Sequence, residues 1–218
     1  MPEPLTVVAF GGGATALMLH LSRRYFEIAK EVVDIVLGSI ALLVSLPTLA
    51  VCAIIIKLSG RGPVFYTQRR VGQHGQLFWM YKLRTMYADA ESATGAVWAA
   101  DDDPRVMPAC RWMRHCHADE LPQLINVVKG QMSLVGPRPE RPEIMAKLER
   151  SYPNIRDRLT VRPGITGLAQ VRNGYDTTVD AFRHKLVADL EYIERRKWSV
   201  ELRIMAATLG KLHDNGAH

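Results

Sequence analysis

The chain has 218 residues, of which 48% are hydrophobic, and it carries a formal net charge of +6. This length and apolar fraction exclude an intrinsically disordered chain and are sufficient for one domain with a buried core. The basic excess favours an anionic membrane surface or a phosphate-rich substrate as partner. No RNA-binding signature or zinc-finger spacing accompanies it, so nucleic acid is not expected as a partner.

The first apolar stretch covers residues 5–21 and is short and interrupted by Gly11, Gly12 and Gly13. It lacks the basic start of a signal peptide, and acidic Glu3 precedes it, so it is a poor candidate for one. We treat residues 1–31 as an N-terminal segment that is partly apolar. The sequence leaves open whether this segment lies at a membrane surface or has no role there.

The second apolar stretch predicts a membrane helix over residues 32–57. Residues 32–56 contain one charge near the start, Asp34, followed by 22 uncharged residues from 35 to 56, and Lys57 ends the stretch. Such a run is long enough to cross the roughly 30 Å hydrocarbon layer as a helix. A buried helix of a soluble protein is the alternative, but such helices are rarely this long and uncharged.

Pro47 lies in the middle of this stretch and predicts a bend, because it removes one backbone hydrogen bond. Ser45 is close enough to satisfy a carbonyl that the proline frees. Basic residues lie on both sides of the stretch, namely Arg23, Arg24, Lys30, Lys57, Arg61, Arg69 and Arg70. Positive charge marks the cytoplasmic side. A helix that bends at Pro47 and returns to the same side fits this pattern better than a kinked single span.

Residues 63–86 predict a β-hairpin. Two runs rich in aromatic and β-branched residues, at 64–66 and 77–79, flank a polar turn with the sequence GQHGQ. The following residues, 87–104, are acidic and small and include the sequence DDDP, which is typical of a loop.

The stretch HADELPQLINVVKGQ predicts a short helix over residues 119–129. Its apolar residues Leu121, Leu124, Ile125 and Val128 follow a helical period, and Gly130 stands where a C-terminal cap belongs. Asp119 and Glu120 then fall at the N-terminus. Taken alone, they are explained as a helix cap and a residue that meets the helix dipole.

Several cations surround this pair of acids in sequence motifs that also contain prolines or aromatic residues. They are Lys82 and Arg84 in YKLRTM, Arg138 in GPRPERPE and Arg162 in TVRPG. Each alone is most simply a solvated surface charge. Together they are the groups that bind a diphosphate.

Two C-terminal stretches predict amphipathic helices, at residues 179–197 and 198–212. Their apolar stripes contain Phe182, Leu186, Leu190 and Ile193 in the first, and Trp198, Leu202, Met205 and Leu209 in the second. Core packing explains such stripes by default. A position in the membrane interface is the alternative, because a membrane segment is present.

The three cysteines, Cys52, Cys110 and Cys116, cannot all pair with one another. A disulfide framework is therefore not expected, which favours a reducing compartment. Cys110, Cys116 and His117 also lack the spacing of a zinc site, so a packing role is preferred over metal binding.

Three motifs, YKLRTM, DELPQLINVVKGQMSLVGPRPE and RPGITGLAQV, resemble the bacterial sugar transferase family, the monotopic phosphoglycosyl transferases that load polyprenyl phosphate. With the preceding apolar stretch, the resemblance covers residues from about 30 to 212, and the middle motif is long and specific. The chain resembles the short form of the family, with a catalytic domain over residues 58–212 and a tail over 213–218.

The resemblance implies a reaction in which a UDP-sugar and polyprenyl phosphate give a polyprenyl diphosphate sugar and UMP. It implies that Asp119 is the nucleophile, that Asp119 and Glu120 bind the required Mg²⁺, and that Lys82, Arg138 and Arg162 match family motifs. It also implies a helix-dominated α+β fold with a re-entrant helix, interfacial helices and a small cytosolic domain at the bacterial inner membrane. We further expect a helix start at Asp119 to keep its carboxylate ionised and to favour phosphate.

The chain departs from the family pattern between residues 105 and 118. Met107 stands where relatives often have threonine, Cys110 where they have glycine, and the sequence CHA precedes Asp119. These departures support one alternative, a membrane-anchored protein that binds nucleotide sugars without catalysis. A basic protein that binds anionic lipid only structurally explains the charge but not the clustered motifs. The sugar and the oligomeric state, including a homo-oligomer, are left open by the sequence.

Overall fold

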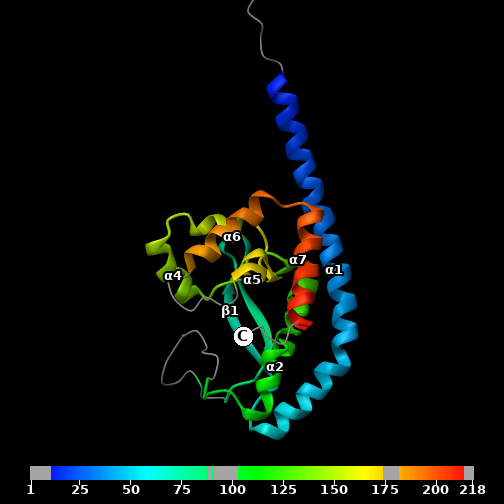
Figure 1. Ribbon diagram of the computed structural model, residues 1–218, viewed down its shortest axis with the longest axis vertical. Coiled ribbons are helices and arrows are strands. Elements are labelled where there is room, and N and C mark those ends of the chain that lie inside the picture. Colours follow the sequence, from blue (N-terminus) through cyan, green and yellow to red (C-terminus); the bar gives the residue numbers. More distant parts are fainter. Residues whose placement is uncertain (1–10, 88–89, 91–102, 174–181, 214–218) are drawn as a thin grey trace, which may run out of the picture.

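A computed structural model of the chain describes residues 11–87, 90, 103–173 and 182–213. It has the predicted helix-dominated α+β fold, in which a long N-terminal helix runs beside a body of short helices and strands (Figure 1). The predictions for residues 1–10, for most of the 87–104 loop and for the tail after residue 213 lie outside the described residues.

Helix α1 covers Gly11–Ser59 and is continuous over 49 residues. The predicted boundary between residues 31 and 32 thus falls inside one helix. The stretch Leu21–Ser59 is long and apolar enough to cross a membrane, and its best window has a mean hydropathy of 2.5 and is only 11% buried. The core helix of a soluble protein would be mostly buried. α1 instead exposes a row of large apolar side chains that includes Val36, Ile40, Leu43, Val44, Val51 and Ile54.

Pro47 lies inside α1, and the helix continues through it. Figure 1 shows α1 changing direction in its second half, between its blue and cyan parts, as expected near a proline. The Ser45 hydroxyl donates a hydrogen bond to the Leu42 carbonyl at 2.8 Å. The carbonyl that Pro47 leaves without a donor belongs to Leu43. The prediction that Ser45 satisfies the carbonyl freed by Pro47 is therefore wrong, because Ser45 binds the carbonyl of Leu42, the residue before Leu43.

The predicted hairpin is confirmed. Strand β1 (Phe65–Val71) pairs antiparallel with β2 (Leu77–Leu83), and a 3₁₀ turn η1 (Gln73–Gly75) joins them. Phe78 and Met80 of β2 are buried against Val127 and Met132, whereas Trp79 between them is exposed. This alternation follows the two-residue period of a strand and leaves one face of the hairpin open.

The predicted helix over residues 119–129 is wrong at its start. Helix η2 (Pro108–Cys110) and helix α2 (Arg111–His115) come first, followed by a separate 3₁₀ turn η3 (Ala118–Glu120) and then α3 (Gln123–Val128). Pro122 is the N-cap of α3, so the two acids precede the helix and neither caps it. The predicted C-terminal signal is confirmed, because Gly130 has a φ of +70° beyond the last turn.

α3 packs closely against α1. A Cβ atom at Gly38 of α1 would lie 2.9 Å from Cγ1 of Val127 in α3. A glycine at this position therefore permits the two helices to approach, as small residues do at helix contacts in membrane proteins. This contact places the segment that follows the two acids directly against the membrane helix.

The rest of the body is built from short elements. Strand β3 (Ser133–Val135) pairs in parallel with β4 (Gly164–Thr166), and their connection contains α4 (Pro142–Ser151) and the 3₁₀ helix η4 (Ile155–Thr160). Helices α5 (Leu168–Asn173), α6 (Phe182–Glu194) and α7 (Trp198–His213) complete the described chain.

The two predicted amphipathic helices differ in what they bury. In α6, Phe182 and Leu186 are buried in the core with Ile144 and Leu148, so this stripe is a core face and not an interfacial one. In α7, Leu202 and Leu209 are exposed, and Trp198 packs edge to face on Phe26 of α1 with ring centroids 5.3 Å apart. Figure 1 shows α7 lying alongside α1. An apolar outer face on α7 agrees with the interfacial alternative.

The first half of α1 is joined to the body by a buried polar group that we call the Asp34 network (Lys30, Asp34, Ser133, Tyr192 and Glu201). Lys30 Nζ lies 3.2 Å from Asp34 and 2.8 Å from Glu201 of α7. The Ser133 hydroxyl donates to Asp34 at 2.7 Å, and the Tyr192 hydroxyl donates to Glu201 at 2.7 Å. Asp34, the charge near the start of the predicted membrane stretch, thus faces protein and not lipid.

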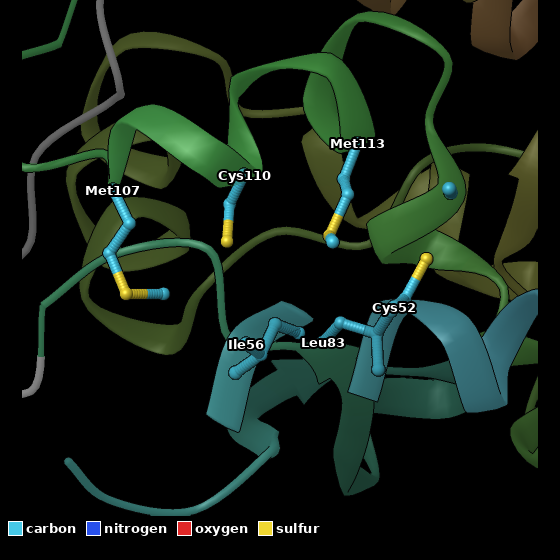
Figure 2. Close-up of a cluster of buried hydrophobic side chains, with 7 residues drawn as sticks. Cys52, Ile56, Leu83, Met107, Cys110 and Met113 are labelled. Atoms are coloured by element: carbon cyan, nitrogen blue, oxygen red, sulfur yellow. The ribbon is translucent and has the colours of Figure 1, made fainter. Parts of the chain in front are cut away.

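The second half of α1 is joined to the body by a sulfur-rich apolar cluster (Cys52, Ile56, Leu83, Met107, Cys110, Met113 and Ala118). Figure 2 shows the Cys52 side chain of α1 facing Cys110 and Met113 from the segment before the two acids. All three cysteines are free thiols, which confirms that the chain has no disulfide framework. The body therefore contacts α1 both before and after Pro47.

Candidate active site

The two acids lie on a tight reversal of the chain, residues 117–120, which we call the dyad turn. His117 adopts a left-handed conformation with φ 56°, and the 3₁₀ turn at Ala118–Glu120 follows it. Ala118 is buried in the sulfur-rich cluster against α1. The turn is thus fixed to the membrane helix on one side and presents Asp119 and Glu120 on the other.

Glu120 is held by two of the cations that the sequence singled out. Its Oε1 accepts a hydrogen bond from Lys82 Nζ at 2.8 Å and also from Arg138 Nη2, and its Oε2 accepts one from Arg138 Nη1 at 3.0 Å. Burial by itself would raise the pKa of Glu120, but the charges of Arg138 and Lys82 outweigh it and hold the pKa well below its usual range. The lowered pKa favours the ionised form of Glu120, and its carboxylate is held by Lys82 and Arg138.

Asp119 is different although it is the next residue. Its side chain is buried, with 7% of the residue exposed. Within the part of the chain that the structure describes, no hydrogen bond or ion pair joins its carboxylate. Burial raises the pKa of Asp119, the charge of Lys82 opposes the rise and the Glu120 carboxylate adds to it. The expectation that a helix start keeps Asp119 ionised is wrong, because α3 begins only at Gln123.

Lys82 reaches the dyad from β2, where it is the last residue but one. Its side chain is 17% exposed, and burial lowers the pKa of Lys82, while the negative charge of Glu120 opposes that change. This lysine lies in electrostatic range of both acids. It is thus the group that links the hairpin to the dyad.

Arg138 reaches the dyad from a loop whose backbone is fixed at every residue. The carbonyl oxygens of residues 137–140 accept hydrogen bonds, in order, from Gly164 N, Arg158 Nη2, Arg70 Nη1 and Val71 N, at 2.9–3.0 Å. Such a loop has little freedom to move its arginine. Arg138 contacts Glu120 of the dyad, and its role in binding the substrate phosphate stays a prediction.

The loop rests on a second buried ion cluster, which sequence reasoning missed. We call it the Glu140 cluster (Glu140, Arg158, Lys185 and Asp189). Arg158 Nη2 lies 2.6 Å from Asp189, and Lys185 Nζ lies 2.5 Å from Glu140. The partners are 31 and 45 residues apart in the sequence. No local pattern joins residues so distant, so the sequence carried no signal for them.

Two predicted phosphate ligands lie elsewhere in the described structure. Arg84 donates hydrogen bonds to the Arg61 carbonyl at 2.7 Å and to the Gly60 carbonyl at 2.9 Å. It therefore closes the C-terminal end of α1. Arg162 pairs with Glu31 of α1 and so ties the loop before β4 to the membrane helix. These contacts of Arg84 and Arg162 do not include Asp119 or Glu120.

The dyad fits a magnesium ion that is completed by substrate. Asp119 offers two carboxylate oxygens with no protein partner among the described residues, and Glu120 Oε2 accepts only one hydrogen bond. No group of three or more acidic, histidine or cysteine side chains suited to a metal occurs in the described chain. Mg²⁺ commonly binds one or two carboxylates together with substrate phosphates and water. The residues thus suit a metal that arrives with a diphosphate.

The departures from the family pattern have a packing role. Met107 and Cys110 are buried in the sulfur-rich cluster, where they contact α1 (Figure 2). Cys116 is exposed, and the preceding α2 carries the buried Met113 into the same cluster. The altered segment therefore packs between the dyad turn and α1. Its substitutions change which side chains fill the sulfur-rich cluster at that contact.

Comparison with known proteins gives a family for the whole described body. A family model described as bacterial sugar transferase matches residues 25–215. An undecaprenyl-phosphate glucose phosphotransferase of Komagataeibacter xylinus is 41% identical over 195 residues, which are 87% of this chain and 36% of the relative.

Two further relatives extend this result. A UDP-N-acetylgalactosamine-undecaprenyl-phosphate N-acetylgalactosaminephosphotransferase of Aeromonas hydrophila is 38% identical over 184 residues, or 84% of this chain and 43% of the relative. An exopolysaccharide production protein PSS of Rhizobium leguminosarum bv. phaseoli is 35% identical over 187 residues, or 84% of this chain and 94% of the relative. The chain thus spans less than half of two relatives and nearly all of the third.

Proposed function

The chain belongs to the bacterial sugar transferase family, and we propose that it transfers a sugar 1-phosphate from a UDP-sugar to a polyprenyl phosphate, with release of UMP. Relatives bear names of undecaprenyl-phosphate sugar phosphotransferases. Their names differ in the sugar, so the proposal commits to the reaction and to the UDP-sugar class. It places the chain at the membrane step that begins polysaccharide synthesis.

One observation carries the proposal. Asp119 is buried close to Lys82, yet Lys82 and Arg138 bind Glu120 and leave the Asp119 carboxylate without a hydrogen bond or ion pair among the described residues. A largely buried carboxylate whose pKa is raised by burial and opposed by a nearby cation is typical of a functional group. The positive charges of Lys82 and Arg114 near Asp119 suit an oxygen that must approach a diphosphate.

The mechanism assigns the two acids different roles. An Asp119 oxygen attacks the β-phosphorus of the donor, and the bond from that phosphorus to the bridging oxygen breaks, so that UMP leaves with the bridging oxygen. A phosphate oxygen of the polyprenyl phosphate then attacks the same phosphorus and releases Asp119. Glu120 stays ionised and holds Lys82 and Arg138, which offset charge on the donor and on the departing UMP.

A magnesium ion would be held by Asp119, with Glu120 Oε2 beside it, and by the donor diphosphate. When bound, it supplies charge neutralisation at the phosphates. Of the other cations named from the sequence, Lys82 and Arg138 act at the dyad, whereas Arg84 binds carbonyls just after the C-terminal end of α1 and Arg162 pairs with Glu31 within that helix. The latter two thus support the site from a distance.

The contacts of α1 support a re-entrant helix. The body binds Lys30 and Asp34 before the bend, and Cys52 and Ile56 after it. Asp34 and Cys52 are separated by 17 uncharged residues, and a straight helix would place them about 27 Å apart, close to the thickness of the hydrocarbon layer and so on opposite sides of a bilayer. One small body that contacts both sets favours a helix that enters and leaves on the same, cytoplasmic side. The dyad turn then lies at the headgroup level, where a lipid phosphate is found.

The test is the leaving group. Detergent-solubilised full-length protein is incubated with Mg²⁺, polyprenyl phosphate and a panel of UDP-sugars, and the released nucleotide is identified. UMP release that requires the lipid phosphate supports the proposal. UDP release would indicate an ordinary glycosyltransferase, and nucleotide-sugar binding with no release for any sugar would favour the non-catalytic alternative.

A further inference from the structure

Asn126 is a fully buried polar residue of α3 to which the mechanism gives no role. Its exposed fraction is 0%. Its side-chain amide donates hydrogen bonds to the Trp79 carbonyl at 2.7 Å and to Gln131 Oε1 at 2.8 Å, and its Oδ1 accepts one from the Tyr81 backbone N–H at 3.1 Å. The whole carboxamide is thus used, and two of its three bonds reach β2.

The hydrogen bonds of Asn126 to the Trp79 carbonyl and the Tyr81 N–H take the place of those that a neighbouring strand would make. A carbonyl and an N–H two residues apart on one strand are the groups that an adjacent strand would bind. β1 is the only strand that pairs with β2 in the described sheet. The Asn126 carboxamide therefore satisfies backbone groups of β2 at the point where α3 crosses it.

The same two segments carry the ion pair of the active site. Tyr81 is followed directly by Lys82, and α3 begins three residues after Glu120. Asn126 thus joins the segment of Lys82 to the segment of Glu120 through hydrogen bonds to the β2 backbone, in addition to their own 2.8 Å contact, the packing of Val127 on β2 and the Lys129 bond to the Tyr81 hydroxyl. A shift of β2 along α3 would separate Lys82 from the dyad.

We propose that Asn126 is a positioning residue that holds Lys82 of β2 against Glu120 and beside Asp119. The proposal rests on the proposed function for its kinetic test, but the placement of Lys82 can be measured without turnover. A purely structural Asn126 would stabilise the fold without acting through Lys82. The two roles are separated by asking whether the effect of Asn126 depends on Lys82.

The kinetic test is a double-mutant cycle of Asn126→Ala and Lys82→Gln, scored by UMP release. We expect Asn126→Ala alone to lower kcat by roughly 10- to 100-fold and to change KM for the UDP-sugar by less than about threefold. In the Lys82→Gln background, we expect it to lower kcat by less than about threefold, since residues that act as a unit are not additive. Full multiplication of the two effects, or an unchanged kcat for the single variant, would overturn the proposal.

The matched control is Ser133→Ala, which removes a buried hydrogen bond from β3 to Asp34 outside the dyad. Its effect on kcat should multiply fully with that of Lys82→Gln. Thermal unfolding in detergent checks that each variant is folded. If Asn126→Ala does not fold, Asn126→Asp takes its place, because it keeps the volume and the acceptor for Tyr81 while losing the donor to Trp79.

A second readout does not need activity. The modification rate of Lys82 by an amine reagent is measured by mass spectrometry in the full-length protein. We expect the rate to rise several-fold in Asn126→Ala and to stay unchanged in Ser133→Ala. An unchanged Lys82 rate in both variants would refute the positioning role, whereas failure of the wild-type protein to release UMP would refute only the proposed function.

Discussion

The dyad turn and the Glu140 cluster are two buried ion clusters of similar composition that differ in one respect. Each has a glutamate whose pKa is lowered by two cations and an aspartate whose pKa is raised by burial. Asp189 nevertheless accepts two hydrogen bonds from Arg158, at 2.6 and 3.1 Å, whereas Asp119 accepts none from the described residues. A cluster with every acid bonded stabilises a loop. A cluster in which one acid has no hydrogen bond from the described residues offers a carboxylate that can bind or attack a ligand.

The strongest test of this difference replaces Asp119 by asparagine. Asp119→Asn should abolish turnover, with a loss of at least about 10³-fold in UMP release, since it removes the attacking oxygen. The melting temperature should stay the same or rise slightly, because an unpaired buried carboxylate is removed. Single-turnover assays and thermal unfolding measure the two effects. An active Asp119→Asn protein would overturn the assignment of the nucleophile.

The reciprocal change is Asp189→Asn in the Glu140 cluster. It removes the charge of the acid nearest to the buried Arg158 and leaves only Glu140, at 3.8 Å, which should lower the free energy of unfolding by up to about 3–5 kcal/mol. The measurement is denaturant unfolding in detergent, followed by circular dichroism. Protein that remains folded should keep part of its activity. If stability were unchanged while activity vanished, the contrast between the two clusters would be lost.

A smaller effect is expected from Lys82→Gln on the pH dependence of activity. Lys82 lowers the pKa of Asp119, so its loss should raise that pKa further. Because attack needs the ionised carboxylate, activity disappears as the pH falls through this pKa, and in the variant it should disappear at a higher pH. Profiles of kcat/KM for UMP release test this shift. Lys129→Gln, which removes a lysine that pairs with the Tyr81 hydroxyl, is the charge-matched control.

The smallest effect concerns acid stability. Burial would raise the pKa of Glu140, but Lys185 and Arg158 lower it to about 2. Because this pKa is depressed on folding, Glu140 contributes stability above its ordinary pKa of 4.5, and the contribution is lost as the pH falls toward 2. Melting temperatures between these pH values should therefore fall less steeply in Glu140→Gln than in the wild type. Parallel slopes would show that Glu140 is not the responsible group.

The local parts of the fold were predictable from the sequence because local patterns determine them. The two-residue period and the GQHGQ turn predict the hairpin, Pro47 predicts a change of direction, and Gly130 predicts the end of α3. The start of α3 was not predictable in this way, because the left-handed His117 and Pro122 divide one apolar period into two turns. A helical period does not reveal such a break.

The site was predictable only in part. The motifs bring Asp119, Glu120, Lys82 and Arg138 to attention, and the structure places Glu120 with both cations. The contacts of Arg84 and Arg162 with α1 were not predictable, because an arginine before a proline or within an aromatic motif does not specify its partner. The apolar stripe of α6 was equally ambiguous, and only its contacts with Ile144 and Leu148 identify it as core.

The Asp34 network has a consequence for how the protein can be handled. Removing α1 to obtain a water-soluble fragment would leave Glu201 and Ser133 without Lys30 and Asp34. It would also uncover the thiol and thioether groups of Cys110 and Met113. Helix α1 is therefore part of the folded body and supplies core contacts to it, and it is more than a membrane anchor. A fragment that retains the dyad turn should therefore retain α1 as well.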